Sequence, residues 1–380
     1  MMSLHALCGA RVFTGERFLD GHAVLLDGTR IADVIPATTL PSDMPLEQLD
    51  GGLLAPGFLD AQVNGGGGLL FNETRTVAGA SAIAEAHRPY GSTGLLPTFI
   101  TDLPEPRAEA VAAIRASLAA DIPGILGIHL EGPFLSKARK GAHDPALIVP
   151  MTEDDVDTIL ECGIETVLLT VAAENATPRQ IRRLADGGVI VSLGHSDASY
   201  ETAAAAADAG ARGITHLFNA MSQLGHRGPG VVGAALDHGG LWAGIIADGH
   251  HVDPAALRIA LRGKQGPGRL FLISDAMPPA GVPGDVFYLN GRRVIRRDGK
   301  LLLDDGTLAG ADLTMDQALR FAVSDLAVPL AEALRMASLY PAEFLRLDRT
   351  RGRVAPGFQA DLVLLDDALT VRRTWIGGRP

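Results

Sequence analysis

The sequence predicts an α/β protein in which a (β/α)8 TIM barrel carries a small discontinuous β-sandwich formed by both ends of the chain. The first observation is a set of eight near-continuous apolar runs of strand length in the middle of the chain, most of them separated by helical segments. The second is that short alternating strands with Gly and Pro breaks precede and follow this middle part. The third is the length of 380 residues, since single cores stop growing near about 250–300 residues.

We expect the sandwich to comprise residues 1–54 and 356–380, and the barrel to comprise residues 55–355. The first segment contains the strand-like runs HAVLLDG and RIADVI, and the last contains DLVLLDD and TVRRTWIGG. Because chain termini often lie close together in space, one domain built from both ends is the simplest arrangement.

The barrel strands should be the eight apolar runs, in order FLDAQVN, GLLPTFI, GILGIHLE, TVLLTVA, VIVSLGH, GITHLFN, WAGIIAD and LFLISDA. An open, doubly wound sheet is the alternative architecture. Helices are expected from Pro106 to Ala120 and from Thr152 to Cys162, the second with Thr152 as its N-cap. After the eighth run, the segment from Val286 to Leu303 departs from this pattern. Its Asn290-Gly291 and Asp298-Gly299 pairs between β-rich runs predict hairpins.

The composition is that of a globular protein, with 47% hydrophobic and 20% charged residues. A net charge of -11 argues against a nucleic-acid or membrane surface. The two cysteines, Cys8 and Cys162, form no CxxC pair, which suits a reducing compartment. No apolar run approaches the roughly 18 residues of a membrane-spanning helix, and no basic leader precedes an apolar segment. We therefore expect a soluble, cytoplasmic protein.

Two histidines stand where an apolar run gives way to a loop. The stretch VIVSLGHSDASYETAAAAADAGARGITHLFN places His195 and His216 after successive strands separated by an alanine-rich helical segment. Adjacent parallel strands direct such side chains into one space, and a divalent metal is the commonest reason for two imidazoles to meet there. The alternative is that each histidine only makes a hydrogen bond at a strand end.

Polar residues follow several other strands, and in TIM barrels the active site lies at these carboxyl ends. Glu131 completes a set of two histidines and one carboxylate that leaves a divalent ion an open position for water. Asp275 stands apart as a candidate acid/base, with a second metal ligand or a helix cap as its alternatives. We interpret His129 as a supporting or packing residue rather than a ligand. The remaining strand-end residues are Gln62, Asn64, Asn219 and Asp248.

Specific motifs then point to a family. HLEGPFLSKARKGAH, GHS, THLFNAM, DGHHVDP and SDAMPPAG resemble the N-acetylglucosamine-6-phosphate deacetylase family of the amidohydrolase superfamily, and the resemblance covers essentially the whole chain. It implies hydrolysis of the N-acetyl group of an amino-sugar phosphate to acetate and glucosamine 6-phosphate. Relatives that act on N-acetylgalactosamine 6-phosphate, or a barrel that only binds a sugar phosphate, are the alternatives.

The resemblance also implies roles for individual residues. Glu131, His195 and His216 would be the metal ligands, Asp275 the catalytic acid/base, and His143 a helper at the substrate carbonyl. It implies a homodimer in which some phosphate contacts, that of His251 among them, cross the interface. The implied substrate-binding residues are Ala142, Asn219, Ala220 through its backbone, Arg227, His251, Leu308, Ala309 and Gly310. Arg227 suits a phosphate because its donors are forked and its charge is permanent.

One departure from the wider superfamily concerns the metal count. Many of its barrels carry His-x-His after strand one and a lysine on strand four, whereas this chain has Gln62-x-Asn64 and no lysine in TVLLTVA. Amides are poor ligands for a transition metal beside imidazole and carboxylate. We therefore predict one divalent ion per subunit, with zinc as the first choice and ferrous iron as the alternative. Gln62 and Asn64 would be remnants of a second-metal position, at which weak binding is left open. The missing two-metal ligand set speaks against cyclic-amide or dipeptide hydrolysis.

Overall fold

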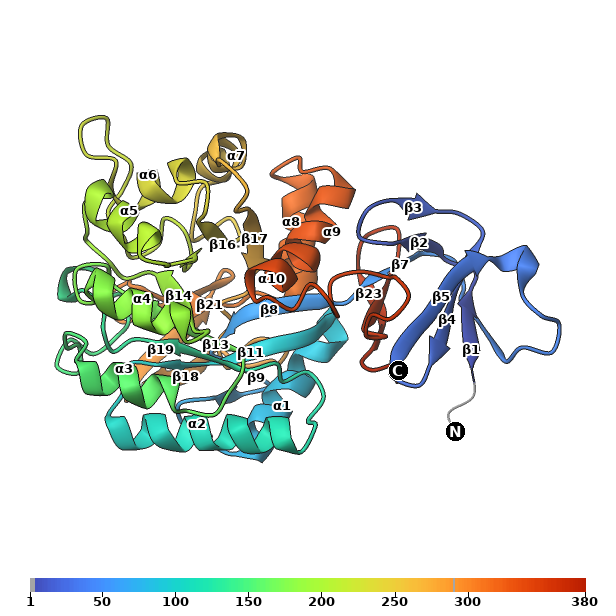
Figure 1. The fold of residues 1–380 in the computed structure, drawn as a ribbon, viewed down its shortest axis with the longest axis horizontal. Helices are drawn as coiled ribbons and strands as arrows, with labels where there is room; N and C mark the ends of the chain where they lie inside the picture. Colours follow the sequence, from blue (N-terminus) through green and yellow to red (C-terminus); the bar gives the residue numbers. More distant parts are fainter. Residues whose placement is uncertain (1–3, 290) are drawn as a thin grey trace.

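The computed structural model describes residues 4–289 and 291–380, and its centre is a barrel of eight parallel strands (Figure 1). Their order in the sheet is their order in the chain, and the last strand returns to the first. Val63 bridges Ala276 in parallel, and the Asp275 N–H donates to Gln62 O at 3.0 Å. The predicted barrel is thus confirmed against the open sheet. Its strands are β8 (Phe58–Val63), β11 (Ser92–Ile100), β12 (Ile128–Glu131), β13 (Val167–Val171), β14 (Ile190–Leu193), β15 (Gly213–Ile214), β16 (Trp242–Ile246) and β17 (Leu270–Ile273).

Helices cover the outside of the barrel because their alanine and leucine faces pack on apolar strands that are buried on both sides. Thr152 caps its helix as predicted, with Oγ1 accepting the N–H of Asp155 at 3.2 Å. The helix expected from Pro106 begins at Pro104, since proline fits the first turn of a helix. The helices are α1 (Val77–His87), α2 (Pro104–Ala119), α3 (Glu153–Leu160), α4 (Pro178–Asp186), α5 (Tyr200–Asp208), α6 (Gly230–Asp237), α7 (Pro254–Gly263), α8 (Met315–Ser324), α9 (Leu330–Ala337) and α10 (Leu339–Phe344).

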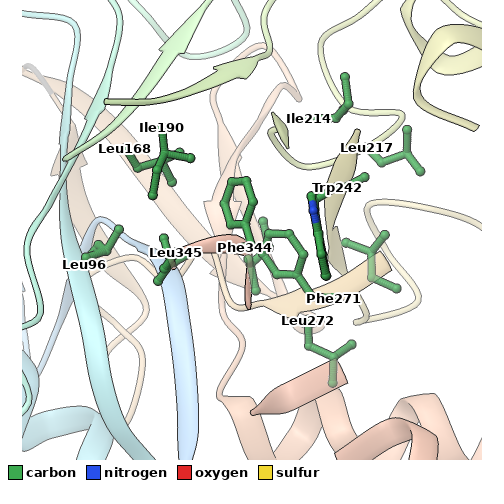
Figure 2. Packing of buried hydrophobic residues seen from close by; sticks show 14 of the residues in the cluster. Leu96, Leu168, Ile190, Ile214, Leu217, Trp242, Phe271, Leu272, Phe344 and Leu345 are labelled. Atoms are coloured by element: carbon green, nitrogen blue, oxygen red, sulfur yellow. The ribbon is translucent and has the colours of Figure 1, made fainter. Parts of the chain in front are cut away.

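Aromatic side chains fill the end of the barrel at which the strands begin. Phe344 of α10 stacks on Phe271 of β17 with 4.8 Å between ring centroids, and Figure 2 shows the two rings together beside Trp242. Gly213 makes room for them, because a Cβ atom there would lie 2.7 Å from the Phe344 ring. This end is closed by packing, so a cavity for a ligand has to form at the opposite end, where the strands stop.

Both ends of the chain build the sandwich, as expected. β7 (Leu53–Pro56) runs between β2 (Arg11–Phe13) and β22 (Leu362–Leu365) and pairs with both. Figure 1 places both chain ends on this part of the molecule, beside the barrel. One sheet has the order β23-β22-β7-β2-β3, with β23 (Val371–Trp375) and β3 (Phe18–Leu19), and the other has the order β5-β4-β1-β6, with β5 (Arg30–Pro36), β4 (His22–Asp27), β1 (His5–Cys8) and β6 (Leu46–Gln48). The bounds 1–54, 55–355 and 356–380 stay a prediction.

The β-rich segment that follows the eighth strand forms a separate antiparallel sheet, which lies over the mouth of the barrel. Asp298 and Gly299 have φ values of 51° and 73°, as a two-residue hairpin turn requires, so this predicted turn is confirmed. Asn290 lies outside the described residues, and the predicted Asn290-Gly291 turn is not described with it. The strands are β18 (Val286–Leu289), β19 (Arg292–Arg297), β20 (Lys300–Leu303) and β21 (Leu308–Ala311).

Shorter elements complete the connections. Within residues 4–289 and 291–380, no helix is both long enough and apolar enough to cross a membrane. The remaining elements are the strands β9 (Gly65–Gly66) and β10 (Leu69–Leu70) and the 3-10 turns η1 (Ala37–Thr39), η2 (Arg88–Tyr90) and η3 (Lys137–Arg139).

Candidate metal centre and active site

Three buried side chains from separate strands converge at the mouth of the barrel. Glu131 is the last residue of β12, while His195 and His216 follow β14 and β15. The two Nε2 atoms lie 3.0 Å apart, and they lie 3.3 Å (His195) and 3.1 Å (His216) from Oε1 of Glu131. The sequence predicted this convergence, and the structure brings all three together.

The backbone at these strand ends is unusual. His195, His216 and Asp275 have φ values of 46°, 34° and 51°, in the left-handed region that side chains rarely adopt. Each such residue costs about 1–3 kcal/mol, and residues of this kind cluster at active sites, where the surrounding structure holds them in place. Backbone hydrogen bonds hold two of them here: the Ser136 N–H donates to the His195 carbonyl at 2.8 Å, and the Asp275 N–H donates to the Gln62 carbonyl at 3.0 Å.

Hydrogen bonds within the cluster favour the ionised form of Glu131. Burial by itself raises the pKa of Glu131, but the hydrogen bonds from His195 and His216 outweigh it and hold that pKa well below its ordinary value. Burial lowers the pKa of His216, yet its hydrogen bond to Glu131 reverses the direction and raises it. The glutamate is therefore an anion set against two imidazoles, a donor set that attracts a cation.

Asp275 lies beside this cluster with two amides donating to it. Asn64 Nδ2 donates to Oδ1 of Asp275 at 2.7 Å, and Gln62 Nε2 donates to the same oxygen at 3.1 Å and to Glu131 at 3.2 Å. Burial, the larger cause, and the charge of Glu131, the next, raise the pKa of Asp275 to about 6. Gln62 and Asn64 thus present N–H donors, rather than metal ligands, to the two carboxylates.

His143 reaches the same space from the loop after β12. Its Nδ1 lies 2.8 Å from Oγ1 of Thr101, and its ring stands edge-on to His195 with 4.5 Å between centroids. Burial, the larger cause, and the neighbouring His195, the next, lower the pKa of His143 to about 3. The imidazole is therefore neutral at pH 7, with Nε2 as the ring nitrogen that Thr101 leaves unused.

The loop that carries His143 is folded onto a predicted metal ligand. Nδ1 of His195 lies 2.8 Å from the carbonyl oxygen of Arg139, which orients the ring so that Nε2 points toward Glu131. Gly141, at φ 55°, lies against the same ring. No sequence pattern indicated these contacts or the role of Thr101, because each depends on how the loop folds.

His129 does not join the cluster. Its Nδ1 lies 3.1 Å from Oγ1 of Thr98 and its Nε2 lies 2.8 Å from Oγ1 of Thr170, so both ring nitrogens are engaged by hydroxyls. Burial lowers its pKa to about 4. These contacts support its interpretation as a supporting residue.

A cavity of about 350 Å³ opens above these side chains. Most of the predicted substrate-binding residues line it, while Gln62 lies beneath it. His251, in the loop that follows β16, also lines the cavity, and its Nδ1 lies 2.6 Å from Oδ2 of Asp248. The lining residues that the sequence predicted are Asn64, Glu131, Ala142, His143, His195, His216, Asn219, Ala220, His251, Asp275, Leu308, Ala309 and Gly310.

The structure places two of the predicted phosphate contacts differently. His251 lines the cavity of its own chain, and its predicted contact across a dimer interface stays a prediction. Arg227 lies in an exposed loop between β15 and α6 and is outside the cavity that the other residues line. Sequence spacing could not separate these two cases, because both residues follow barrel strands.

The residues present fit a divalent ion. Donors about 2.0–2.2 Å from one tetrahedral centre are about 3.3–3.6 Å apart, close to the 3.0–3.3 Å observed between the three donor atoms. Two imidazoles and a carboxylate are also the donor set of many hydrolytic metal sites, in which a further position stays open to water.

Comparisons with known proteins agree with this geometry. The amidohydrolase family model matches residues 53–380, and the model of the NagA composite domain matches residues 4–54. The chain is 43% identical to the N-acetylgalactosamine-6-phosphate deacetylase of a Shewanella species, over 89% of this chain and 85% of that protein. It is 36% identical to the N-acetylglucosamine-6-phosphate deacetylase of Haemophilus influenzae, over 99% and 98% of the two chains.

A solved structure extends the comparison to the fold. The crystal structure of N-acetylglucosamine-6-phosphate deacetylase from Pasteurella multocida superposes with a TM-score of 0.96 at 36% identity, covering 99% of each chain. Family model, sequence relatives and fold therefore agree over the whole length, and the chain belongs to the amidohydrolase family, among its deacetylases of N-acetylated amino-sugar 6-phosphates.

Proposed function

We propose that this protein is a metal-dependent deacetylase that hydrolyses N-acetylglucosamine 6-phosphate to glucosamine 6-phosphate and acetate, in amino-sugar catabolism. The observation that carries the proposal is the meeting of Glu131, His195 and His216 in one cavity with Asp275 beside them. The similarity of the chain to deacetylases along nearly its whole length supports the choice of reaction.

Glu131, His195 and His216 would hold one divalent ion, which would supply Lewis acidity and lower the pKa of water so that it can ionise to a nucleophile near neutral pH. The donor set suits several such ions, and we favour zinc over ferrous iron. Gln62 and Asn64 donate hydrogen bonds to the neighbouring carboxylates, which supports a single ion per subunit.

Asp275 is the proposed acid/base. It accepts a proton from the attacking water and passes it to the departing nitrogen, so that the amine leaves as a neutral group. The pKa of about 6 suits this double task, because the group is ionised at pH 7 yet basic enough to carry a proton. Asn64 and Gln62 fix the carboxylate in place for both transfers.

His143 is the proposed partner of the acetamide oxygen. Its Nδ1 lies 2.8 Å from Oγ1 of Thr101, and in the proposed tautomer the neutral ring carries its proton on Nε2, from which it can donate to the carbonyl. That hydrogen bond strengthens as the carbonyl oxygen becomes an anion in the tetrahedral state.

The sugar phosphate would extend toward the side of the cavity that follows β15 and β16. Asn219, the backbone of Ala220 and His251 line it there, and Ala142 with the turn from Leu308 to Gly310 lines the sugar. Arg227, exposed on its own chain, would reach the phosphate of a second copy, which makes the active form a homodimer. The free Cys8 and Cys162 support a cytoplasmic location.

N-acetylgalactosamine 6-phosphate is the second candidate substrate, because the Shewanella relative at 43% identity carries that name. The two sugars differ at one hydroxyl. The test is acetate release from both phosphorylated sugars by purified protein whose metal content has been measured. We expect turnover of the gluco compound with about one ion bound per chain, and a lack of acetate from it would overturn the proposal. A higher kcat/KM for the galacto compound would favour the second candidate.

A further inference from the structure

One wall of the cavity is apolar. Ile100 at the end of β11, Met277 after β17 and Leu289 in β18 all line it, with exposed fractions of 7%, 3% and 1%. They belong to one hydrophobic cluster, to which Ala309 also belongs and against which Ala142 packs. No proposed step of the hydrolysis uses this surface, which we call the acyl wall (Ile100, Met277 and Leu289).

The residues proposed to bind the phosphate lie elsewhere around the barrel. Asn219 and Ala220 follow β15, and His251 follows β16. In the acyl wall, Ile100 ends β11 and Met277 follows β17, the two strands on either side of β8, while Leu289 comes from β18. The cavity therefore has a side suited to a sugar phosphate and a different side where three apolar side chains stand next to Asp275.

The substrate has the same division. The carbonyl carbon of an N-acyl amino sugar is planar. Its bond to the nitrogen, which carries the sugar, and its bond to the acyl chain therefore point in different directions, about 120° apart. If the phosphate takes the polar side and the carbonyl meets His143 and Asp275, the acyl chain turns toward the acyl wall. We propose that Ile100, Met277 and Leu289 form an acyl pocket that admits acetyl and rejects longer N-acyl groups.

The acyl wall is held in place, as discrimination by acyl-chain length requires. The Met277 N–H donates to Ala311 O at 3.1 Å, and its carbonyl accepts the Ala280 N–H at 3.0 Å. Gly310 lies so close that a Cβ atom there would be 2.4 Å from Cγ of Met277, so the side chain is held against β21. A fixed apolar wall discriminates between chain lengths by about 10–200-fold per methylene.

The inference rests on the proposed function, and it is tested with glucosamine 6-phosphates that carry formyl, acetyl, propanoyl or butanoyl groups. Release of the free amine gives kcat/KM for each compound. For the wild-type protein we expect acetyl to exceed propanoyl by at least about tenfold, with butanoyl lower again.

Two variants enlarge the pocket from different elements. Met277→Ala and Leu289→Ala should each raise the butanoyl-to-acetyl ratio of kcat/KM by at least about tenfold, because the space they open matches the added methylenes. Leu289 lies in the antiparallel sheet, so its replacement leaves the barrel strands untouched. Thermal unfolding of each variant checks that the protein is folded.

The control is Ile246→Ala, which shortens a buried aliphatic side chain that lines the same cavity from the end of β16. We expect the butanoyl-to-acetyl ratio of this variant to remain that of the wild type. The inference is overturned if both pocket variants keep the wild-type ratio, or if Ile246→Ala shifts it equally. Absence of turnover with all four sugars would instead overturn the proposed function, and this inference with it.

Discussion

Asp275 is the residue on which the proposed chemistry turns. Asparagine keeps its size and its place beside Asn64 and Gln62 but cannot carry a proton. We expect Asp275→Asn to lower kcat by about 10²–10⁴-fold, the usual range for a lost acid/base. Acetate release measures kcat, and elemental analysis should show the wild-type metal content. Near-normal turnover by a variant with full metal content would remove Asp275 from this role.

Asp60 is a further buried carboxyl group in the barrel, besides Glu131 and Asp275, and it has no part in the proposed hydrolysis. Oδ1 accepts the N–H groups of Ser274 at 3.2 Å and Gln62 at 3.3 Å, while Oδ2 has no hydrogen-bond partner among the described residues. Burial raises the pKa of Asp60 from 3.8 to about 7. The folded protein thus holds a proton at this position over a range in which the unfolded chain has lost it.

This difference sets the sign of a pH effect on stability. Between about pH 4 and pH 7 the unfolded chain binds fewer protons at Asp60 than the folded one, so the free energy of unfolding falls as the pH rises. Asp60→Asn removes the titration. We expect the melting temperature of the variant, relative to wild type, to rise between pH 5 and pH 8 in calorimetry. Asp43→Asn, at an exposed position, controls for the loss of one carboxylate. If the difference in melting temperature between Asp60→Asn and wild type did not change with pH, the raised pKa of Asp60 would be contradicted.

At the scale of elements, the loop from η3 to His143 couples the metal ligand to the group at the carbonyl. The loop carbonyl at Arg139 orients His195, and a Cβ atom on Gly141 would lie 3.1 Å from Cε1 of the same ring. The position of this loop therefore determines the orientation of the His195 ring.

Gly141→Ala tests that feature. The added methyl group presses on His195, and the φ of 55° is strained for alanine. We expect metal affinity to fall about 10–100-fold, as when outer partners of a ligand are changed, measured by competition with a chromophoric chelator. Gly188→Ala is the matched control, since its φ is 95° and nothing lies within 4 Å of the added Cβ. Equal affinity in the two variants would sink the idea.

Sequence reasoning succeeds where one physical rule dominates. The barrel strands were predictable because strands buried on both faces must be apolar throughout, and Glu131, His195 and His216 were predictable because parallel strands end at one face. The contact between His195 and Arg139 was not, since it depends on the fold of a loop. The same holds for Arg227, whose exposed loop lies outside the cavity, and for Met277, whose role depends on how the antiparallel sheet that follows it packs over the barrel.

At the scale of the whole molecule, the exposed Arg227 makes the proposed homodimer testable. Loss of a charged hydrogen bond costs about 1.5–3 kcal/mol, so we expect Arg227→Ala to raise KM for the phosphorylated sugar about 10–100-fold. The value of kcat should change little, because the phosphate contact is the same in ground and transition states. Steady-state kinetics measures both constants.

Mixed dimers decide from which chain the arginine comes. Co-expression of Arg227→Ala with Asp275→Asn gives dimers in which one site has an intact Asp275 and receives Arg227 from the other chain. We expect these dimers to regain turnover at the wild-type KM. If Arg227 serves its own chain, no site in the mixture is complete and the low KM does not return.

The discontinuous sandwich has a consequence for how the protein is made. β7 emerges early from the ribosome, but its neighbour β22 is among the last strands to be synthesised. Throughout translation of the barrel, β7 therefore presents an open edge that no local partner can cover. The nascent chain must keep that edge from joining another polypeptide until the final strands arrive.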